Sequence, residues 1–259
     1  MRRMHANASL PRSGSELLQA LLGQHPEVFA SATSPLLDYV YGAQSNATDP
    51  AVLAQPRESA HRAFTGFARA GCIGYYEEQT ERPVVVDKSR GWLEYAELLW
   101  RIFPAAKIIS MIRPTEHILE SMDRAYLRNL GHPETRNIPR SRSERFEYWT
   151  RPDCLPLGLA LSRLRARQEL GPDPRIRYVQ YEELVKNPVD VMGQVFAWLD
   201  LPEIVVDSQN VVKVAAEHDA VFGIYGRHHV RQAVCKDGHQ NLDRSDGISR
   251  LYSSHASED

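Results

Sequence analysis

The sequence predicts an α/β fold in three layers, in which a central parallel sheet lies between two layers of helices. Short runs of β-branched and apolar residues alternate along the chain with segments of helical periodicity. The apolar runs are continuous, as in parallel strands that are buried on both faces. Strands that alternate with helices imply right-handed crossovers, and ligands of such sheets bind at the carboxyl ends of the strands.

Four segments are expected to form strands, and the first of them is inferred from the helical pattern that follows it. They are residues 4–10, 82–89, 106–113 and 175–184. Five helices are expected at residues 15–22, 92–103, 115–129, 157–170 and 188–199. Residues 43–70 are interpreted as an irregular or helical insertion and not as part of the sheet.

Local signals mark the ends of three of these helices. Thr115 is expected to cap the third helix at its N-terminus. Gly171 and Pro172 predict the end of the fourth helix, because glycine readily adopts the left-handed conformation that closes a helix. Asn187 followed by Pro188 predicts the start of the fifth helix, with asparagine as the cap and proline in the first turn.

The composition is that of a globular protein. Of the 259 residues, 42% are hydrophobic and 25% are charged, which suffices for one large domain or two small ones. We expect a single domain over residues 1–235 and a polar, loosely ordered tail over residues 236–259. The formal net charge of −2 gives no indication of a nucleic-acid partner.

No segment predicts a membrane span, a signal peptide or a structural metal site. No apolar run approaches the roughly 20 residues that cross a bilayer, and no apolar stretch follows the two N-terminal arginines. Cys72, Cys154 and Cys235 are scattered, which argues against a disulfide framework and against a zinc site. We therefore expect a cytoplasmic protein that needs no metal.

Residues 11–16, "PRSGSE", form the predicted turn between the first strand and the first helix. Gly14 lets the backbone pass close to a ligand, and the backbone N–H groups of the turn would point outward at the positive end of the helix. Arg12 adds a charge, and Ser13 and Ser15 add hydroxyl donors. These are the elements of a phosphate-binding loop, although the spacing and the lysine of a Walker loop are absent.

Two further positions with polar or charged side chains follow predicted strands. Arg113 closes the third strand, and Ser121 lies just over two turns along the next helix, so the two can converge on a second phosphate. Lys88 lies at the carboxyl end of the second strand, where an open α/β sheet places its ligands. Each feature alone also fits an ordinary turn, strand end or helix. The three together, in this order, indicate a nucleotide site.

In this order and spacing the chain resembles the sulfotransferases that use 3′-phosphoadenosine 5′-phosphosulfate (PAPS), most closely the bacterial and tyrosylprotein branch. The resemblance rests on "PRSGS", "QHPEV", "DKSRGW", "YEEL" followed by "NP", and "RHHVRQAV", and it extends over roughly residues 5–235. It implies a P-loop-like fold and in-line transfer of a sulfuryl group from PAPS to a hydroxyl or amine. The acceptor would be a small molecule, a glycan or a peptide, and the product 3′-phosphoadenosine 5′-phosphate (PAP).

The resemblance also implies roles for individual residues. Lys88 and Arg12 would stabilise the charge on the leaving phosphate. Arg113 and Ser121 would bind the 3′-phosphate, which is the group that distinguishes PAPS from ATP. The implied cofactor contacts are Arg12, Ser13, Gly14, Ser15, Glu16, Arg113, Ser121, Tyr181 and Arg231, with Tyr181 near the adenine and Arg231 near the 3′-phosphate.

Two positions depart from the pattern of that family. Glu16 stands where the loop usually ends in threonine, and a carboxylate repels an anionic ligand unless it is paired or turned outward. The general base of the tyrosylprotein enzymes has no counterpart in "FASATSPLLDY" before Asp38. Glu217, His218 and Asp219 are the alternatives, and we favour His218 as a catalytic base because histidine titrates near neutral pH.

Two other functions fit parts of the sequence. A P-loop nucleotide kinase or NTPase would need a loop lysine, which is absent, and an acidic Mg²⁺ ligand at a strand end, which Asp87 could supply. A catalytically inactive homologue that binds a nucleotide or a partner would fit Glu16 and the missing base.

Overall fold

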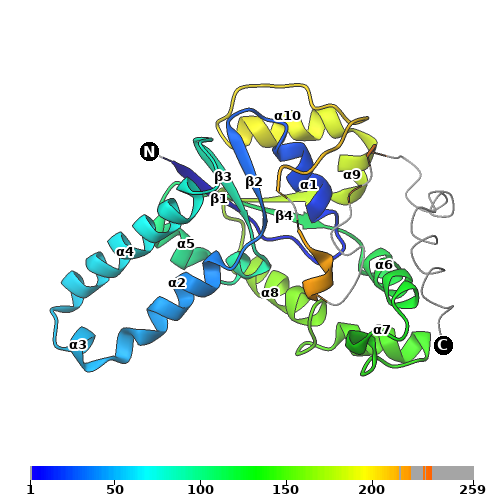
Figure 1. The fold of residues 1–259 in the computed structure, drawn as a ribbon, viewed down its shortest axis with the longest axis horizontal. Helices are drawn as coiled ribbons and strands as arrows, with labels where there is room; N and C mark the ends of the chain where they lie inside the picture. Colours follow the sequence, from blue (N-terminus) through cyan, green and yellow to red (C-terminus); the bar gives the residue numbers. More distant parts are fainter. Residues whose placement is uncertain (1, 216, 223–229, 231, 235–259) are drawn as a thin grey trace, which may run out of the picture.

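The computed structural model describes residues 2–215, 217–222, 230 and 232–234 of the chain. Its centre is a sheet of five parallel strands in the order β2-β3-β1-β4-β5 (Figure 1). The strands are β1 (Arg3–Asn7), β2 (Val28–Thr33), β3 (Val84–Lys88), β4 (Ile108–Ile112) and β5 (Ile176–Gln180). The predicted α/β class with a parallel sheet is confirmed.

The four predicted strands are present, and the sequence prediction missed β2. Alanine and serine interrupt its run "VFASAT", so the β-branched pattern that marks the other strands is weak there. β5 is also shorter than predicted, because helix α9 (Tyr181–Lys186) begins directly after Gln180. Glu182 and Glu183 lie in the first turn of that helix, where negative charge is favourable.

Helices fill the connections between the strands. The α-helices are α1 (Ser15–Leu22), α2 (Leu36–Ser45), α3 (Pro50–Leu53), α4 (Arg57–Glu77), α5 (Ala96–Ile102), α6 (Thr115–Arg128), α7 (Arg142–Thr150), α8 (Gly158–Glu169), α9 and α10 (Pro188–Trp198). Short 3₁₀ turns are η1 (Asn46–Thr48), η2 (Arg90–Leu93), η3 (Pro133–Thr135) and η4 (Asp219–Phe222). The insertion at residues 43–70 is helical, and α1 has the predicted bounds.

The predicted helix ends are confirmed at two of the three marked positions. Asn187 is the N-cap of α10 and Pro188 its first residue. Gly171 follows the C-cap of α8 with a φ of 87°, the left-handed conformation expected of it. Thr115 was predicted one position off, because it is the first residue of α6 and the extended Pro114 is the N-cap.

Helices cover both faces of the sheet (Figure 1). On one face α1, α9 and α10 pack on Val84 and Val86 of β3. On the opposite face α4, α5, α6 and α8 pack on Val85 and on alternate residues of β1. Successive side chains of a strand point to opposite faces, so each strand contributes to both cores.

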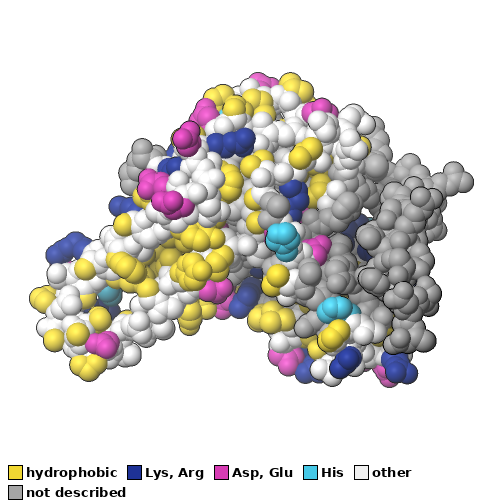
Figure 2. Space-filling view, in the orientation of Figure 1, with side chains coloured by type: hydrophobic (Ala, Val, Ile, Leu, Met, Phe, Trp, Pro, Cys, Tyr) yellow, Lys and Arg dark blue, Asp and Glu magenta, His cyan; other side chains and the backbone are white. Residues whose placement is uncertain are grey.

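Helices α2, α3 and α4 extend away from the sheet as a helical arm (Figure 1). Hydrophobic side chains gather on its surface (Figure 2). Tyr39, Leu53 and Phe67 are among them, with exposed fractions of 62%, 69% and 66%. No helix in the described residues combines the length and the apolar character that a membrane crossing requires.

A buried carboxylate joins β3 to α4 and η2. Asp87 is fully buried and accepts hydrogen bonds from the hydroxyls of Tyr76 and Ser34 and from the indole N–H of Trp92, the last at 2.5 Å. The bond to Trp92 holds that residue in η2, which explains why the predicted helix at residues 92–103 starts only at Ala96. Because its oxygens are committed to three donors, Asp87 is not the exposed Mg²⁺ ligand that a kinase would require.

We expect Tyr76→Phe to lower the free energy of unfolding by about 1–3 kcal/mol, because it removes one donor from a buried carboxylate. Urea unfolding followed by circular dichroism measures the change. Tyr39→Phe on the exposed arm is the matched control and should change stability by less than about 0.5 kcal/mol. Equal effects of the two substitutions would contradict the role given to the Tyr76 hydroxyl.

Candidate functional site

The turn between β1 and α1 has the backbone of an anion-binding loop. Gly14 has a φ of 98° and Arg12 a φ of 57°, so two residues of this short turn are left-handed. A non-glycine residue with positive φ is uncommon, and such residues concentrate at functional sites. Gly14 is the N-cap of α1 and supplies no side-chain cap, so the first N–H groups of the helix are directed toward a ligand position.

Glycine is required at position 14 for a second reason. A Cβ there would lie 2.5 Å from the Tyr181 ring, which packs directly on the loop from the start of α9. Ser13, by contrast, is fully buried and its Oγ donates to the carbonyl of Leu10 at 2.6 Å. The structure therefore corrects one expectation, because the hydroxyl of Ser13 closes the turn and does not face a ligand.

A buried amide places α1 over the end of β1. Gln19 donates through Nε2 to the carbonyls of Ser31 at 2.8 Å and Val86 at 3.1 Å, and its Oε1 accepts from Asn7 at 3.3 Å. One side chain thus connects the helix to three neighbouring strands. The loop that precedes the helix is held at the carboxyl edge of the sheet by these bonds.

Arg113 faces this loop from the end of β4. Its Nη1 donates to the carbonyl of Arg12 at 3.2 Å, and its guanidinium lies over the ring of Tyr181, 4.1 Å from the centroid. The side chain is only 8% exposed. Its Nε is buried and makes no hydrogen bond within the described part of the chain, while Oε1 of Glu182 lies 3.6 Å away.

Ser121 completes this group from helix α6. Its Oγ accepts a hydrogen bond of 3.2 Å from Nε of Arg12. Arg12, Arg113, Ser121, Gly14 and Tyr181 are therefore neighbours, although they come from four segments of the chain. The sequence prediction that these positions converge agrees with their placement.

Beside the loop, four charged side chains form a closed ring of ion pairs. Lys88 at the end of β3 pairs with Glu16 of α1 and, at 3.2 Å, with Glu217. Lys213 pairs with Glu16 at 2.8 Å and with Glu217 at 2.7 Å. The four side chains are between 5% and 18% exposed. We call this set, Glu16, Lys88, Lys213 and Glu217, the charge ring.

The chain after α10 brings Lys213 and Glu217 to the ring. Gln24 at the end of α1 binds this segment through its side chain, donating to the carbonyl of Asp207 at 2.9 Å and accepting from the N–H of the same residue at 2.7 Å. Val214 packs on Gly23, where a Cβ would lie 2.4 Å from its methyl group. Sequence analysis missed Lys213, whose one signal is its spacing of four residues from Glu217.

The charge ring lowers the pKa of Glu217. Burial alone would raise it, but the Lys88 ammonium and hydrogen bonds from Lys213 and the Thr33 backbone N–H outweigh burial. The pKa of Lys213 is raised: burial lowers it, and its bonds to Glu16 and Glu217 more than offset this. Glu217 and Lys213 therefore stay ionised at neutral pH.

One predicted residue of the described chain does not join this group. His218, favoured above as a base, is exposed, while the neighbouring Glu217 contacts Lys88. Glu217 and not His218 lies at Lys88, because a buried ammonium without an ion-pair partner is energetically unfavourable. Arg231 and residues 236–259 lie outside the described residues.

The fold and this geometry define an α/β protein with a left-handed strand–helix turn that contains Arg12 and is flanked by Arg113 and Lys88 at one edge of a parallel sheet. The chain belongs to the sulfotransferase family, whose family model matches residues 8–205. No curated protein matches the chain significantly.

Solved structures share this fold at low sequence identity. A sulfotransferase of Alicyclobacillus acidocaldarius aligns with a TM-score of 0.52 and 16% identity, covering 80% of this chain and 85% of its own. The sulfotransferase domain of the Synechococcus PCC 7002 olefin synthase aligns with a TM-score of 0.51 and 17% identity, covering 91% and 85%. A mouse sulfotransferase complexed with PAP aligns with a TM-score of 0.50 and 17% identity, covering 80% and 60%.

The charge ring predicts a pH-dependent contribution to stability. Because the pKa of Glu217 is lower in the folded protein than its ordinary value of 4.5, its contribution is complete above about pH 4.5 and is lost as the pH falls below it. Glu217→Gln should therefore lower the urea midpoint at neutral pH. The difference in urea midpoint between this variant and wild type should shrink below about pH 4.5.

Glu203→Gln, at an exposed position after α10, is the control and should follow wild type at every pH. A Glu217→Gln difference that stays constant from neutral to acidic pH would refute the ion pairing described for Glu217.

Proposed function

We propose that the chain is a PAPS-dependent sulfotransferase that transfers the sulfuryl group to an acceptor hydroxyl or amine. The observation that carries this proposal is the placement of Arg113 and Ser121 beside the loop of Arg12 and Gly14, where they would form a second anion position. A nucleotide with phosphates at both its 3′ and 5′ ends needs two such positions, whereas ATP needs only the one at its 5′ end.

The residues present fit such a ligand. The buried Nε of Arg113 is a donor without a hydrogen-bond partner in the described chain, and a ligand oxygen would satisfy it. The left-handed turn at Gly14 would bring backbone N–H groups to the 5′-phosphate, and Ser15 and Glu16 follow in the first turn of α1. Tyr181 would lie against the adenosine, because its ring already stacks between the loop and Arg113.

Within this proposal, PAPS supplies an activated sulfuryl group, and the residues of the chain supply charge and position. Lys88 and Arg12 would stabilise the negative charge that develops on the leaving phosphate, in a site that is preorganised before the ligand arrives. His218 is exposed and follows Glu217 of the charge ring directly, and we keep it as the proposed base at the rim of the site. Its imidazole would take the proton of an acceptor hydroxyl that approaches from solvent.

Glu16 stands where the loop of that family usually ends in threonine, so its negative charge must be offset for an anion to bind. Its carboxylate neutralises Lys88, and a bound anion would compete with it for the same ammonium. Lys213 pairs with the other oxygen of Glu16 at 2.8 Å. In the proposed function Lys213 holds Glu16 away from the ligand, so that Lys88 can turn to the transferred group.

The first prediction of this proposal concerns the two anion positions. PAP should raise the melting temperature, whereas ATP with Mg²⁺ should not; a ligand at about 100 times its Kd stabilises by about 2.7 kcal/mol. The double variant Arg113→Ala with Ser121→Ala should lose more than about tenfold in PAP affinity, because a hydrogen bond to a charged group contributes about 1.5–3 kcal/mol. Its affinity for adenosine 5′-phosphate should be unchanged.

Arg128→Ala, on the exposed last turn of α6, is the matched control and should bind PAP as wild type does. The proposal fails if the double variant keeps the preference for the 3′-phosphate. A melting temperature that responds to ATP with Mg²⁺ and not to PAP would point to the kinase alternative instead.

The second prediction concerns Glu16 and Lys213. Lys213→Met should weaken PAP binding while Glu16 is present, because the unpaired carboxylate then competes fully for Lys88. In a Glu16→Ser background the same substitution should have little effect, which gives a coupling energy of about 0.5–3 kcal/mol in the double-mutant cycle. Calorimetric titration with PAP measures the affinity of wild type, the two single variants and the double variant. Lys186→Met, at an exposed position of α9, is the control. Additive effects would show that the two residues act separately.

A further inference from the structure

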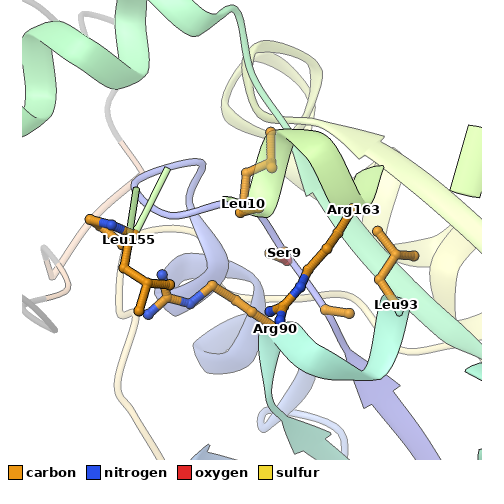
Figure 3. Close-up of a pocket in the computed structure, with 9 residues that line it drawn as sticks. Ser9, Leu10, Arg90, Leu93, Leu155 and Arg163 are labelled. Carbon is orange, nitrogen blue, oxygen red and sulfur yellow. The ribbon is translucent and has the colours of Figure 1, made fainter. Parts of the chain in front are cut away.

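Arginines near the edge of the sheet differ in whether a nucleotide can bind to them. Arg90 and Arg163 line the small cavity shown in Figure 3, which has a volume of about 40 Å³. Because one water needs about 10–15 Å³, this cavity is too small for a nucleotide. Arg163 also pairs with Glu94 at 2.6 Å. No ligand is therefore assigned to the cavity, in contrast to the position at Arg113.

Two consecutive residues of α9 contact the guanidinium of Arg113. The ring of Tyr181 lies against its face, with the centroid 4.1 Å from Cζ. Glu182 approaches its edge, where Oε1 lies 3.6 Å from Nε. The Arg113 side chain is 8% exposed, whereas that of Glu182 is 44% exposed. Within the described residues, Glu182 is therefore the carboxylate that pairs with this buried charge, and it is the partner that solvent can reach.

The contact between Glu182 and Arg113 balances charge without forming a hydrogen bond. Its length of 3.6 Å is beyond the usual range of such bonds, and Nε of Arg113 is buried without an acceptor in the described part of the chain. The attraction between the two charges persists, because a partly buried pair is screened less than an exposed one. Nε thus keeps a donor for a ligand oxygen, while the carboxylate beside it repels an anionic ligand.

His117 provides Glu182 with a second partner. Nδ1 of His117 lies 3.2 Å from the same Oε1 that faces Arg113. His117 belongs to the first turn of α6 and precedes Ser121 by four residues, so the two side chains lie on the same face of that helix. Glu182 therefore lies between Arg113 and His117, and it can leave the arginine while it keeps its contact with the histidine.

We propose that Glu182 competes with the 3′-phosphate for Arg113 and thereby shortens the time for which the product PAP stays bound. When the 3′-phosphate leaves, the carboxylate pairs with Arg113 again, so release does not leave a buried charge without a partner. Product release limits the turnover of many enzymes, and a carboxylate that replaces the departing phosphate lowers that barrier. This inference rests on the proposed function, since it assigns a residue to the release of that reaction's product.

The test compares Glu182→Gln with Glu183→Gln, which removes the same charge from the same exposed first turn of α9. Surface plasmon resonance on the immobilised full-length protein measures the affinity and the dissociation rate of PAP and of adenosine 5′-phosphate. Glu182→Gln should bind PAP about fivefold more tightly, chiefly through slower dissociation, because an ion pair with an exposed partner changes an equilibrium by up to about this factor. Glu182→Ala, which cannot donate a hydrogen bond to a phosphate, should show the same gain.

Affinity for adenosine 5′-phosphate should be unchanged in both Glu182 variants, and Glu183→Gln should bind both nucleotides as wild type does. In an Arg113→Ala background Glu182→Gln should change PAP affinity by less than about twofold, because no guanidinium is left to compete for. A gain that is absent, that Glu183→Gln reproduces, or that persists without Arg113 overturns the inference alone, provided that wild type prefers PAP to adenosine 5′-phosphate. A wild type without that preference refutes the proposed function and this inference with it.

Discussion

The candidate site depends on how one lysine is accommodated at the end of a buried strand. Lys88 follows three fully buried valines of β3 and is itself only 8% exposed, so its ammonium cannot be solvated as a surface lysine is. An ammonium in such a position must be paired or lose its charge. The chain pairs it twice, with Glu16 and Glu217, and then balances those carboxylates with Lys213. Lys88 is thereby paired on two sides beside the β1–α1 loop, and an anion that binds to it would have to displace a carboxylate.

This balance ties the loop to the chain that follows α10. Half of the charge ring belongs to a segment that is almost 200 residues away in the sequence from the loop, and Gln24 attaches that segment to α1. Loss of the attachment would leave Lys88 with Glu16 alone, and Glu16 without Lys213. The folding of the loop and the docking of the segment are therefore energetically coupled, because each supplies the ion-pair partners of the other's buried charges. Substitution of either carboxylate is therefore expected to affect both lysines of the ring.

The sequence allowed the parallel sheet, most helix ends and the loop at residues 11–16 to be predicted, because these features depend on local patterns. A run of β-branched residues predicts a buried strand, and the serine–glycine turn was assigned to a ligand site only in combination with Lys88, Arg113 and Ser121. β2 was missed because alanine and serine weaken that pattern, and its pairing with β3 and its packing in the core are set by tertiary structure. Lys213 and the inward position of Ser13 were missed for a different reason. A lone lysine and a loop hydroxyl carry no local signal, and their partners are set by tertiary structure.

The end of β3 serves the two faces of the sheet in different ways. Successive residues after Val86 alternate, so Asp87 points to the α5 face and is consumed by structural hydrogen bonds, while Lys88 points to the α1 face and its loop. One strand end therefore fixes the packing of one face with a carboxylate and places a lysine beside the β1–α1 loop on the other.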